Sequence, residues 1–253
     1  MNSAPFNLNL ILIFKPLTKI IMKTLIMLAL TGLLFLSCSN DNSSSSDLSE
    51  TPLAKAKFDN TNFGIYKGVL VGSTGVVMVN IKNNNILSAT LIIDGTTYNF
   101  TTVEDVIENN DIVGLTFTSG NMSFNFNVST NGVNPYTNAI VIPGHPNVYI
   151  SLIKEKSTSI VKCYQGTYLD NGANGSTGVF NLLISGNNIY GLAASNSGNS
   201  TVPLSGTVSN KIITGIIYGG GSFSGRINKN NISGTFKNAD SSETGTWSGQ
   251  RTL

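Results

Sequence analysis

The chain has 253 residues, of which only 11% are charged and 26 are glycine. Its formal net charge is +2, but Lys15, Lys19 and Lys23 all lie in the N-terminal segment. Without them, 12 basic residues face 13 acidic ones, a net charge of −1, which excludes a basic surface for nucleic acid. Low charge with abundant Gly, Ser, Thr and Asn favours short strands and turns over long helices.

Residues 22–38 read as an export signal. Lys23 precedes a mostly apolar run, residues 24–36, which would span about 20 Å as a helix. That is less than the ~30 Å hydrocarbon core of a bilayer, so the run has the size of a signal peptide rather than of a membrane span. We expect residues 1–37 to be a signal peptide. We also expect translation to start at Met22, because residues 1–21 add a second apolar patch ahead of a complete signal.

The signal ends in LFLSC, which resembles the lipobox of bacterial lipoproteins, where a small residue precedes the lipid-bearing cysteine. Ser37 fits the small position, and Phe35 departs from the leucine that is common there. The resemblance implies lipid attachment at Cys38, with the membrane as a partner through that lipid. Ser39 after the cysteine resembles the pattern of outer-membrane lipoproteins, facing the periplasm or exposed on the cell surface. The alternative is an ordinary secretory signal with an incidental cysteine.

Residues 38–61 are polar and Ser-rich without periodicity, and are expected to form a flexible tether. Two copies of a related sequence follow. GSTGV stands at 72–76 and again at 175–179, and NNI at 84–86 and at 187–189. We expect two tandem units, residues 62–157 and 158–253. If Cys38 carries lipid, Cys163 has no disulfide partner, and we expect it to be a small, half-buried strand residue.

Each unit divides into eight short apolar-rich segments separated by turn sequences such as KNNN, DG and SGNN. The predicted strands are 63–71, 75–82, 86–93, 97–103, 112–118, 122–129, 138–142 and 148–154, then 164–169, 177–184, 188–194, 202–208, 211–218, 222–228, 231–237 and 244–250. Residues 103–110 are the one expected helical break, of at most two turns. Such spacing predicts an all-β fold of two antiparallel meanders, each an approximately eight-stranded barrel. The alternative is one larger sandwich or barrel formed by both halves.

Period-two alternation marks the inward faces. In MSFNFNVS, from Met122, the apolar residues share one face and the polar ones the other. Large residues alternate with glycine in FSGRINKNNISGTFKNADSSETGTWSG, from Phe223, which resembles the closing hairpins of transferrin-binding-protein-type surface lipoproteins. The resemblance implies barrel topology and no binding residues. Because small barrels use alternating large and small residues to fill their interior, we expect filled units and rank surface interaction above a small-molecule cavity.

The sequence offers little catalytic chemistry. A hydrolytic triad would need His145, the only histidine, which lies between two prolines in an expected loop. Four acids, Glu104, Asp105, Glu108 and Asp111, are the candidates for a calcium site, although the Gly-centred calcium loop is absent and a solvated loop is the main interpretation. We expect no enzyme, no cofactor and no other metal site.

Four aromatic residues in the second unit are the candidate ligand-binding residues. They are Tyr168, Tyr190, Tyr218 and Trp247. The alternative for each is core packing, above all for Trp247 between two glycines. The sequence therefore predicts a lipid-anchored outer-membrane or cell-surface protein that binds or displays, with an unidentified protein or carbohydrate partner. The alternatives are a structural or adhesive envelope protein and a carbohydrate-active hydrolase.

Overall fold

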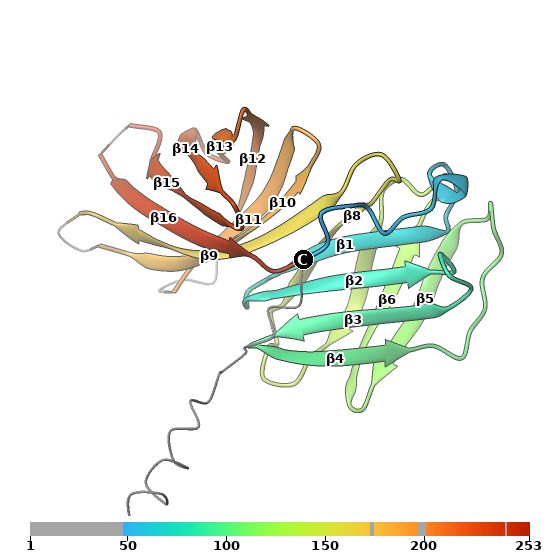
Figure 1. Ribbon diagram of the computed structural model, residues 1–253. Coiled ribbons are helices and arrows are strands. Elements are labelled where there is room, and N and C mark those ends of the chain that lie inside the picture. Colours follow the sequence, from blue (N-terminus) through green and yellow to red (C-terminus); the bar gives the residue numbers. More distant parts are fainter. Residues whose placement is uncertain (1–47, 173–174, 197–200, 241) are drawn as a thin grey trace, which may run out of the picture. The chain divides into compact units, whose positions relative to one another are not determined.

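The computed structural model describes residues 48–253 except 173–174, 197–200 and 241, and it is all-β (Figure 1). A short 3-10 helix, η1 (Ala56–Phe58), precedes sixteen strands in two eight-stranded sheets, and the described residues contain no α-helix. The strands of the first sheet are β1 (Gly64–Val71), β2 (Gly75–Ile81), β3 (Leu87–Ile93), β4 (Thr96–Thr101), β5 (Ile112–Ser119), β6 (Met122–Val128), β7 (Tyr136–Val141) and β8 (Tyr149–Lys154).

The strands of the second sheet are β9 (Val161–Asp170), β10 (Thr177–Ser185), β11 (Asn188–Ser195), β12 (Thr201–Ser209), β13 (Ile212–Ile217), β14 (Gly221–Asn228), β15 (Asn231–Lys237) and β16 (Thr244–Arg251). All sixteen predicted strands are present, and no boundary differs by more than about three residues, the usual scatter at element ends. The predicted pair of tandem eight-stranded meanders is confirmed.

The first sheet is nearly closed and has a filled interior. Its strand order is β7-β6-β5-β4-β3-β2-β1-β8, so β7 and β8 are its two edges. The core holds Tyr66, Phe100, Phe117, Phe124 and Phe126, each at most 1% exposed. Phe117 and Phe124 stack with ring centroids 5.4 Å apart, and Tyr66 meets Phe126 edge-on at 5.0 Å. These large rings fill the space enclosed by the sheet.

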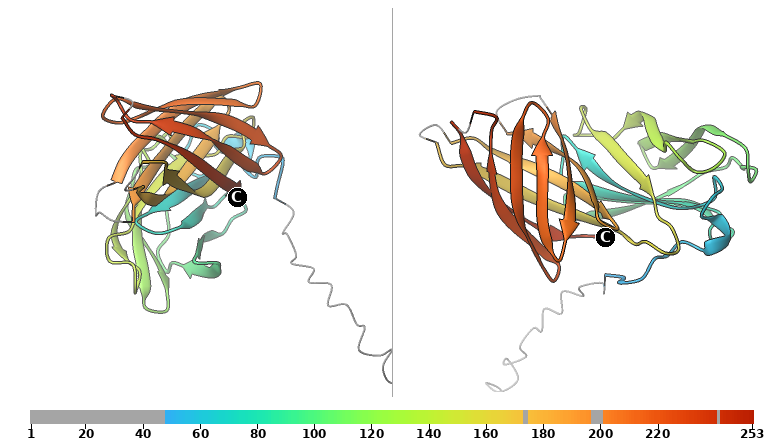
Figure 2. Two further views of the ribbon diagram at one scale, coloured as in Figure 1. Left: turned by 90° about the vertical axis from the view of Figure 1, so that its left-hand side faces the viewer. Right: turned by 90° about the horizontal axis from the view of Figure 1, so that it is seen from above.

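The second sheet closes completely, because β16 pairs with β9 along its length from Gly245↔Asp170 to Arg251↔Tyr164. Its strands run from yellow to red in Figure 2. Closure removes both sheet edges, so every strand has a partner on each side. The strands alternate direction, so the same end of the barrel carries the turns after β9, β11, β13 and β15.

The outer faces of β1 and β2 pack against those of β9 and β10. A small apolar cluster joins them, formed by Val69, Val76, Val161, Cys163 and Leu183, all fully buried. Strands β1 and β2 therefore bury both of their faces, which is why residues 62–70 are buried without interruption. On the side of the first sheet, β1 makes most of this contact, with β9, β10 and β11, and β2 contributes Val76.

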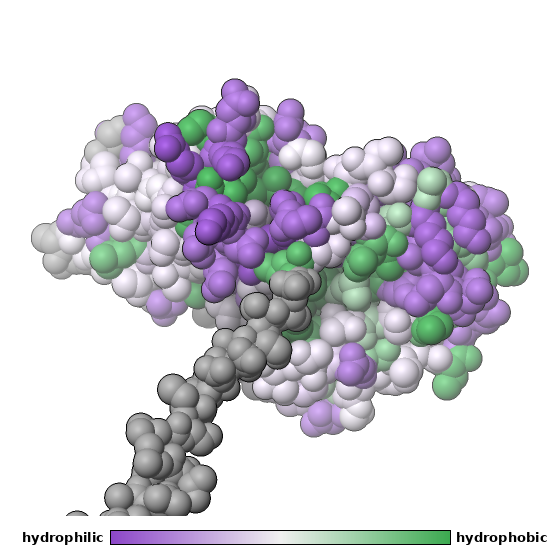
Figure 3. All heavy atoms as spheres, viewed as in Figure 1, coloured by the Kyte–Doolittle hydropathy of each residue, from purple (hydrophilic) through white to green (hydrophobic). Residues whose placement is uncertain are grey.

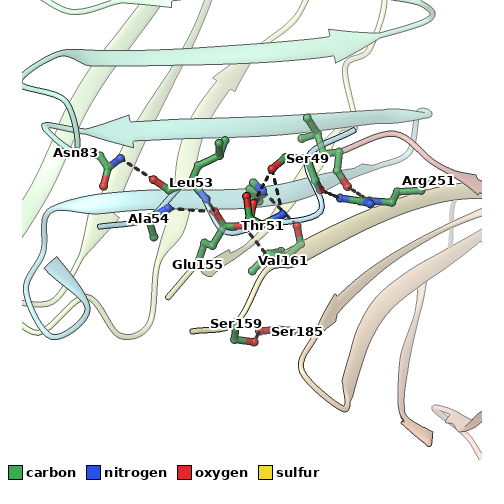
Figure 4. Close-up of polar contacts among 12 residues, drawn as sticks. Ser49, Thr51, Leu53, Ala54, Asn83, Glu155, Ser159, Val161, Ser185 and Arg251 are labelled. Atoms are coloured by element: carbon green, nitrogen blue, oxygen red, sulfur yellow. Dashed lines mark hydrogen bonds and ion pairs between the residues drawn. The ribbon is translucent and has the colours of Figure 1, made fainter. Parts of the chain in front are cut away.

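The described part of the expected tether, residues 48–61, is not a free chain. Phe58 is 4% exposed and meets Phe63 edge-on at 5.6 Å. The backbone N–H of Lys55 donates to Asn83 Oδ1 at 3.0 Å, and Arg251 at the end of β16 bonds Ser49 and Glu50 (Figure 4). The expectation of a tether was wrong over this segment, because its backbone finds buried acceptors that its polar composition does not reveal.

The expected helical break at residues 103–110 is also wrong. Asn62, fully buried, donates through Nδ2 to the carbonyls of Ile107 and Asn110, both at 2.8 Å, and its Oδ1 accepts the N–H of Asn109 at 2.8 Å. Asn109 has a positive φ of 64°, outside the helical region. One asparagine thus holds the backbone groups that a helix would have paired internally.

The predicted signal peptide, its start at Met22 and the lipid-bearing Cys38 lie outside the described residues. In the described part of the chain, no helix has the length and apolar character needed to traverse a bilayer.

Candidate functional site

The closed barrel contains a cavity of about 290 Å³ at one end. All eight strands contribute to its wall, and Ser176, Tyr218, Asn238 and Glu243, from turns at that end, form its rim. We call this end the mouth. Strands β9, β11, β13 and β15 end at the mouth. The expectation of a filled interior was therefore wrong for the second unit at the mouth end.

The opposite end of the barrel is packed solid. Ile184, Ile189, Ile213 and Ile232 are each at most 5% exposed there, together with Tyr164 at 1%. Burial raises the pKa of the Tyr164 hydroxyl above its ordinary value. The packed layer closes the barrel, so the cavity opens only through the mouth within the described residues.

Inward-facing glycines explain how the mouth end stays open. Five inward aromatic rings are each paired across the sheet with a glycine. The pairs are Tyr168↔Gly178, Phe180↔Gly166, Phe223↔Gly215, Phe236↔Gly245 and Trp247↔Gly234. In every pair, a Cβ on the glycine would lie closer than 3.0 Å to the ring. Each ring thus lies against the wall, over its glycine, in the space that a side chain at the glycine position would fill. The centre of the barrel at the mouth end is left empty.

Trp247 lies where the cavity meets the packed layer. It is 6% exposed, and its indole N–H donates to the carbonyl of Thr235 at 3.0 Å. Phe180 and Phe223 contact it edge-on, with ring centroids 5.6 and 6.2 Å away. The indole is therefore fixed in place by a hydrogen bond and two aromatic contacts.

The wall is apolar and the polar groups gather at the rim. Asn238 is engaged within its own turn, because its Oδ1 accepts the N–H of Glu243 at 3.1 Å and its Nδ2 donates to Ser242 Oγ at 3.0 Å. Glu243 is exposed at the rim. Lys237 faces outward, since its neighbour Phe236 points into the barrel. Among the described lining residues, Glu243 is thus the one charged group.

Three of the four predicted aromatic residues meet at this cavity. Tyr168 and Trp247 form part of its wall and Tyr218 part of its rim, whereas Tyr190 lies on the outer surface of the barrel, 45% exposed, beside a shallow hollow. Sequence reasoning missed Phe180, Phe223 and Phe236. The signal that could have found them is the glycine that stands opposite each ring once the hairpin registers are drawn.

The four acids proposed for calcium do not converge on one site, and three of them bond other residues. Glu104 accepts the N–H of Thr116 at 3.1 Å, Asp105 pairs with Lys82, and Asp111 accepts the N–H and hydroxyl of Thr130 at 2.6 Å; Glu108 is exposed. The hydrogen bond from Lys82 lowers the pKa of Asp105, and that from Thr130 lowers the pKa of Asp111. The described residues contain no group of three His, Cys, Asp or Glu side chains placed to hold a metal ion.

The other reactive side chains do not form a catalytic arrangement. His145 lies in a loop, with Nε2 3.3 Å from the Asp94 carboxylate. Cys163 is fully buried in the contact between the sheets, rather than half-buried as expected, and burial raises the pKa of its thiol to about 12. A thiol with such a pKa holds almost no thiolate at neutral pH and is a poor nucleophile.

No family model matches this chain, and no curated protein matches its sequence.

Proposed function

We propose that this protein is a lipid-anchored binding module of the cell envelope, without catalytic activity, whose second barrel takes a small and largely apolar ligand. The observation that carries the proposal is the aromatic-walled cavity, closed at one end and open at the mouth. Its volume of about 290 Å³ lies close to the lower bound of small-molecule pockets, which are concave, mostly apolar and lined by few polar groups.

The wall chemistry supports binding rather than hydrolysis. A glycosidase needs two carboxyl groups flanking the scissile bond, about 5–9 Å apart. Among the described lining residues, Glu243 alone supplies a carboxylate. The remaining wall consists of aromatic and aliphatic side chains, which bury apolar surface and hold a ligand without reacting with it.

The anchor is proposed from the sequence, and the fold is consistent with it. Cys38 stands ten residues before Leu48, where the described chain begins. Ser49 and Glu50 are bonded to Arg251 at the packed end of the barrel, whereas Glu243 marks the mouth at the other end of β16. The chain from the proposed lipid therefore joins the barrel at the end opposite the mouth.

Filling the cavity tests the binding proposal. We expect Ala193→Phe to abolish the fluorescence gain of N-phenyl-1-naphthylamine, a neutral apolar probe, because Ala193 lines the cavity and a phenyl group there occupies its space. The matched control is Ala194→Phe, the next residue on β11, whose side chain points to the other face of the sheet. Equal probe binding by both variants and the unchanged protein, or no binding by the unchanged protein, would contradict the proposal.

Labelling tests the anchor. Cells that express the protein and are fed radioactive palmitate should label the unchanged chain and leave the Cys38→Ala variant unlabelled, because the thiol is the proposed site of acylation. The Cys163→Ala variant serves as the control and should label normally, since Cys163 is fully buried. Label that persists in Cys38→Ala would refute lipid attachment at this residue.

A second candidate, display of a surface that binds a protein or carbohydrate of the envelope, is favoured by one observation. Val103, Ile107 and Val113, in or beside the segment that links β4 to β5, are among the most exposed large apolar residues, at 105, 70 and 82%. Elsewhere hydrophilic side chains predominate on the face shown in Figure 3, with hydrophobic ones in separate patches. A contiguous exposed apolar patch marks an interaction site, and these three side chains would supply one if they adjoin.

A further inference from the structure

We propose that the barrel cavity selects a ligand that carries an organic ammonium group on a compact apolar body, and that Glu243 at the rim recognises its charge. This inference rests on the proposed function and specifies the ligand class of the same site.

Aromatic rings surround the space that such a group would occupy. Six of them line the cavity: Tyr168, Phe180, Tyr218, Phe223, Phe236 and Trp247. The face of an aromatic ring carries negative charge density and attracts cations within about 6 Å of its centroid, with tryptophan the strongest of the three types. Several rings around one space form the kind of cage that holds alkylated ammonium groups, which are too bulky and too weakly hydrated to favour water or a lone carboxylate.

The charges of the second barrel are separated along its axis. Its three acids, Asp170, Asp240 and Glu243, all lie at the mouth end, in or next to the turns after β9 and β15. Of its six bases, Lys237 alone lies at the mouth end. The other five lie on the packed half or in turns at the packed end: Lys162, Lys211, Arg226, Lys229 and Arg251. This separation makes the potential at the mouth negative, which attracts cations and repels anions.

The three acids differ in the hydrogen bonds that they already accept and in whether they line the cavity. Asp170 is 8% exposed and its Oδ1 accepts the N–H of Gly172 at 2.9 Å, whereas Asp240 is exposed and accepts the N–H of Ser242 at 2.9 Å. Glu243 is the acid that lines the cavity. A cation lodged among the rings would thus meet a carboxylate at the rim. An anion would lose its hydration without gaining a basic partner from the described lining.

Matched ligands test the inference on the purified protein. Phenyltrimethylammonium and tert-butylbenzene have the same shape and differ in charge, and benzenesulfonate supplies the anion. The fluorescence of Trp247, the single tryptophan of the chain, reports binding at the cavity wall. We expect the cation to bind about tenfold more tightly than its neutral isostere, as cation–π and carboxylate attraction together predict, and the anion not to bind.

Glu243→Gln should reduce the affinity for the cation several-fold and leave that for tert-butylbenzene unchanged. Glu108→Gln, at an exposed acid in the segment between β4 and β5, is the control and should change neither. Equal affinity for the cation and its isostere, or a Glu243→Gln variant that keeps the full preference, would overturn this inference while leaving a neutral-ligand barrel intact. Binding of none of the three compounds would overturn the inference and, with no response to N-phenyl-1-naphthylamine, the proposed function as well.

Discussion

Replacing Glu155 with alanine should lower the free energy of unfolding by about 3–5 kcal/mol, because it leaves a buried ammonium group without its partner. Glu155 is fully buried directly after β8, and Oε2 lies 2.6 Å from Lys67 Nζ on β1, itself 2% exposed. For a chain of this size the loss should lower the melting temperature by about 10 °C or more. Chemical denaturation and a thermal melt both measure it.

The effect is large because the same carboxylate also joins three segments of backbone. Oε1 accepts the N–H groups of Leu53 at 2.6 Å and Ala54 at 3.3 Å, and Oε2 accepts that of Val161 at 3.0 Å (Figure 4). Residues 48–61, the end of the first sheet and the start of β9 are therefore tied to one side chain. Removing it leaves the buried N–H of Val161 without an acceptor, at a cost of about 1–3 kcal/mol, and also frees the part-buried N–H groups of Leu53 and Ala54.

Two further variants separate charge from hydrogen bonding. The double variant Lys67→Met with Glu155→Gln removes both charges and keeps one amide oxygen, which can still accept the N–H groups of Leu53 and Ala54 but not also that of Val161. It should therefore recover part of the stability lost in Glu155→Ala. Glu108→Ala, at an exposed position, should change the stability by less than about 0.5 kcal/mol. If Glu155→Ala proves no more damaging than Glu108→Ala, the buried pair does not stabilise this fold.

The strands could be predicted because their signals are local. Period-two alternation in segments such as residues 122–128 and turns rich in Asn and Gly fix where a strand starts and which face turns inward. The contact between the sheets had a local signal too. GVVMVNI in β2 and VFNLLI in β10 are apolar on both faces, which is typical of strands covered on both sides.

Other features depend on partners far away in the sequence. Leu53 bonds Glu155 about 100 residues away, and Glu50 bonds Arg251 about 200 residues away. The sequence around Leu53 and Glu50 contains no sign of these partners, so the polar segment was interpreted as a tether. Asn62, which is 45–48 residues from its backbone partners, overrides the helical tendency of residues 103–110. The cavity was missed for a different reason. Alternating large and small residues were expected to fill the interior. Instead, each ring lies over the glycine paired with it across the sheet, which leaves space at the mouth end of the second barrel.

The pairing of Trp247 with Gly234 predicts a second large change in stability. Gly234→Val should destabilise the protein by about 3 kcal/mol and shift the emission of Trp247 to longer wavelength. A Cβ at residue 234 would lie closer than 3.0 Å to the carbonyl of Ser224, the Cα of Gly225 and the indole ring. The two closest contacts are with the backbone of β14, so β14 and β15 must be pushed apart there. The indole must also leave its place and lose its hydrogen bond to Thr235.

Ser233→Val is the matched control for this change, because Ser233 is the preceding residue on β15, faces outward and is exposed. Valine suits an exposed strand position, so this variant should stay within about 0.5 kcal/mol of the unchanged protein and keep its emission maximum. Similar stability and emission in the two variants would show that the glycine does not make room for the ring. If Gly234→Val alone shifts the emission and weakens N-phenyl-1-naphthylamine binding, the inward glycines are what keep the mouth of the barrel open.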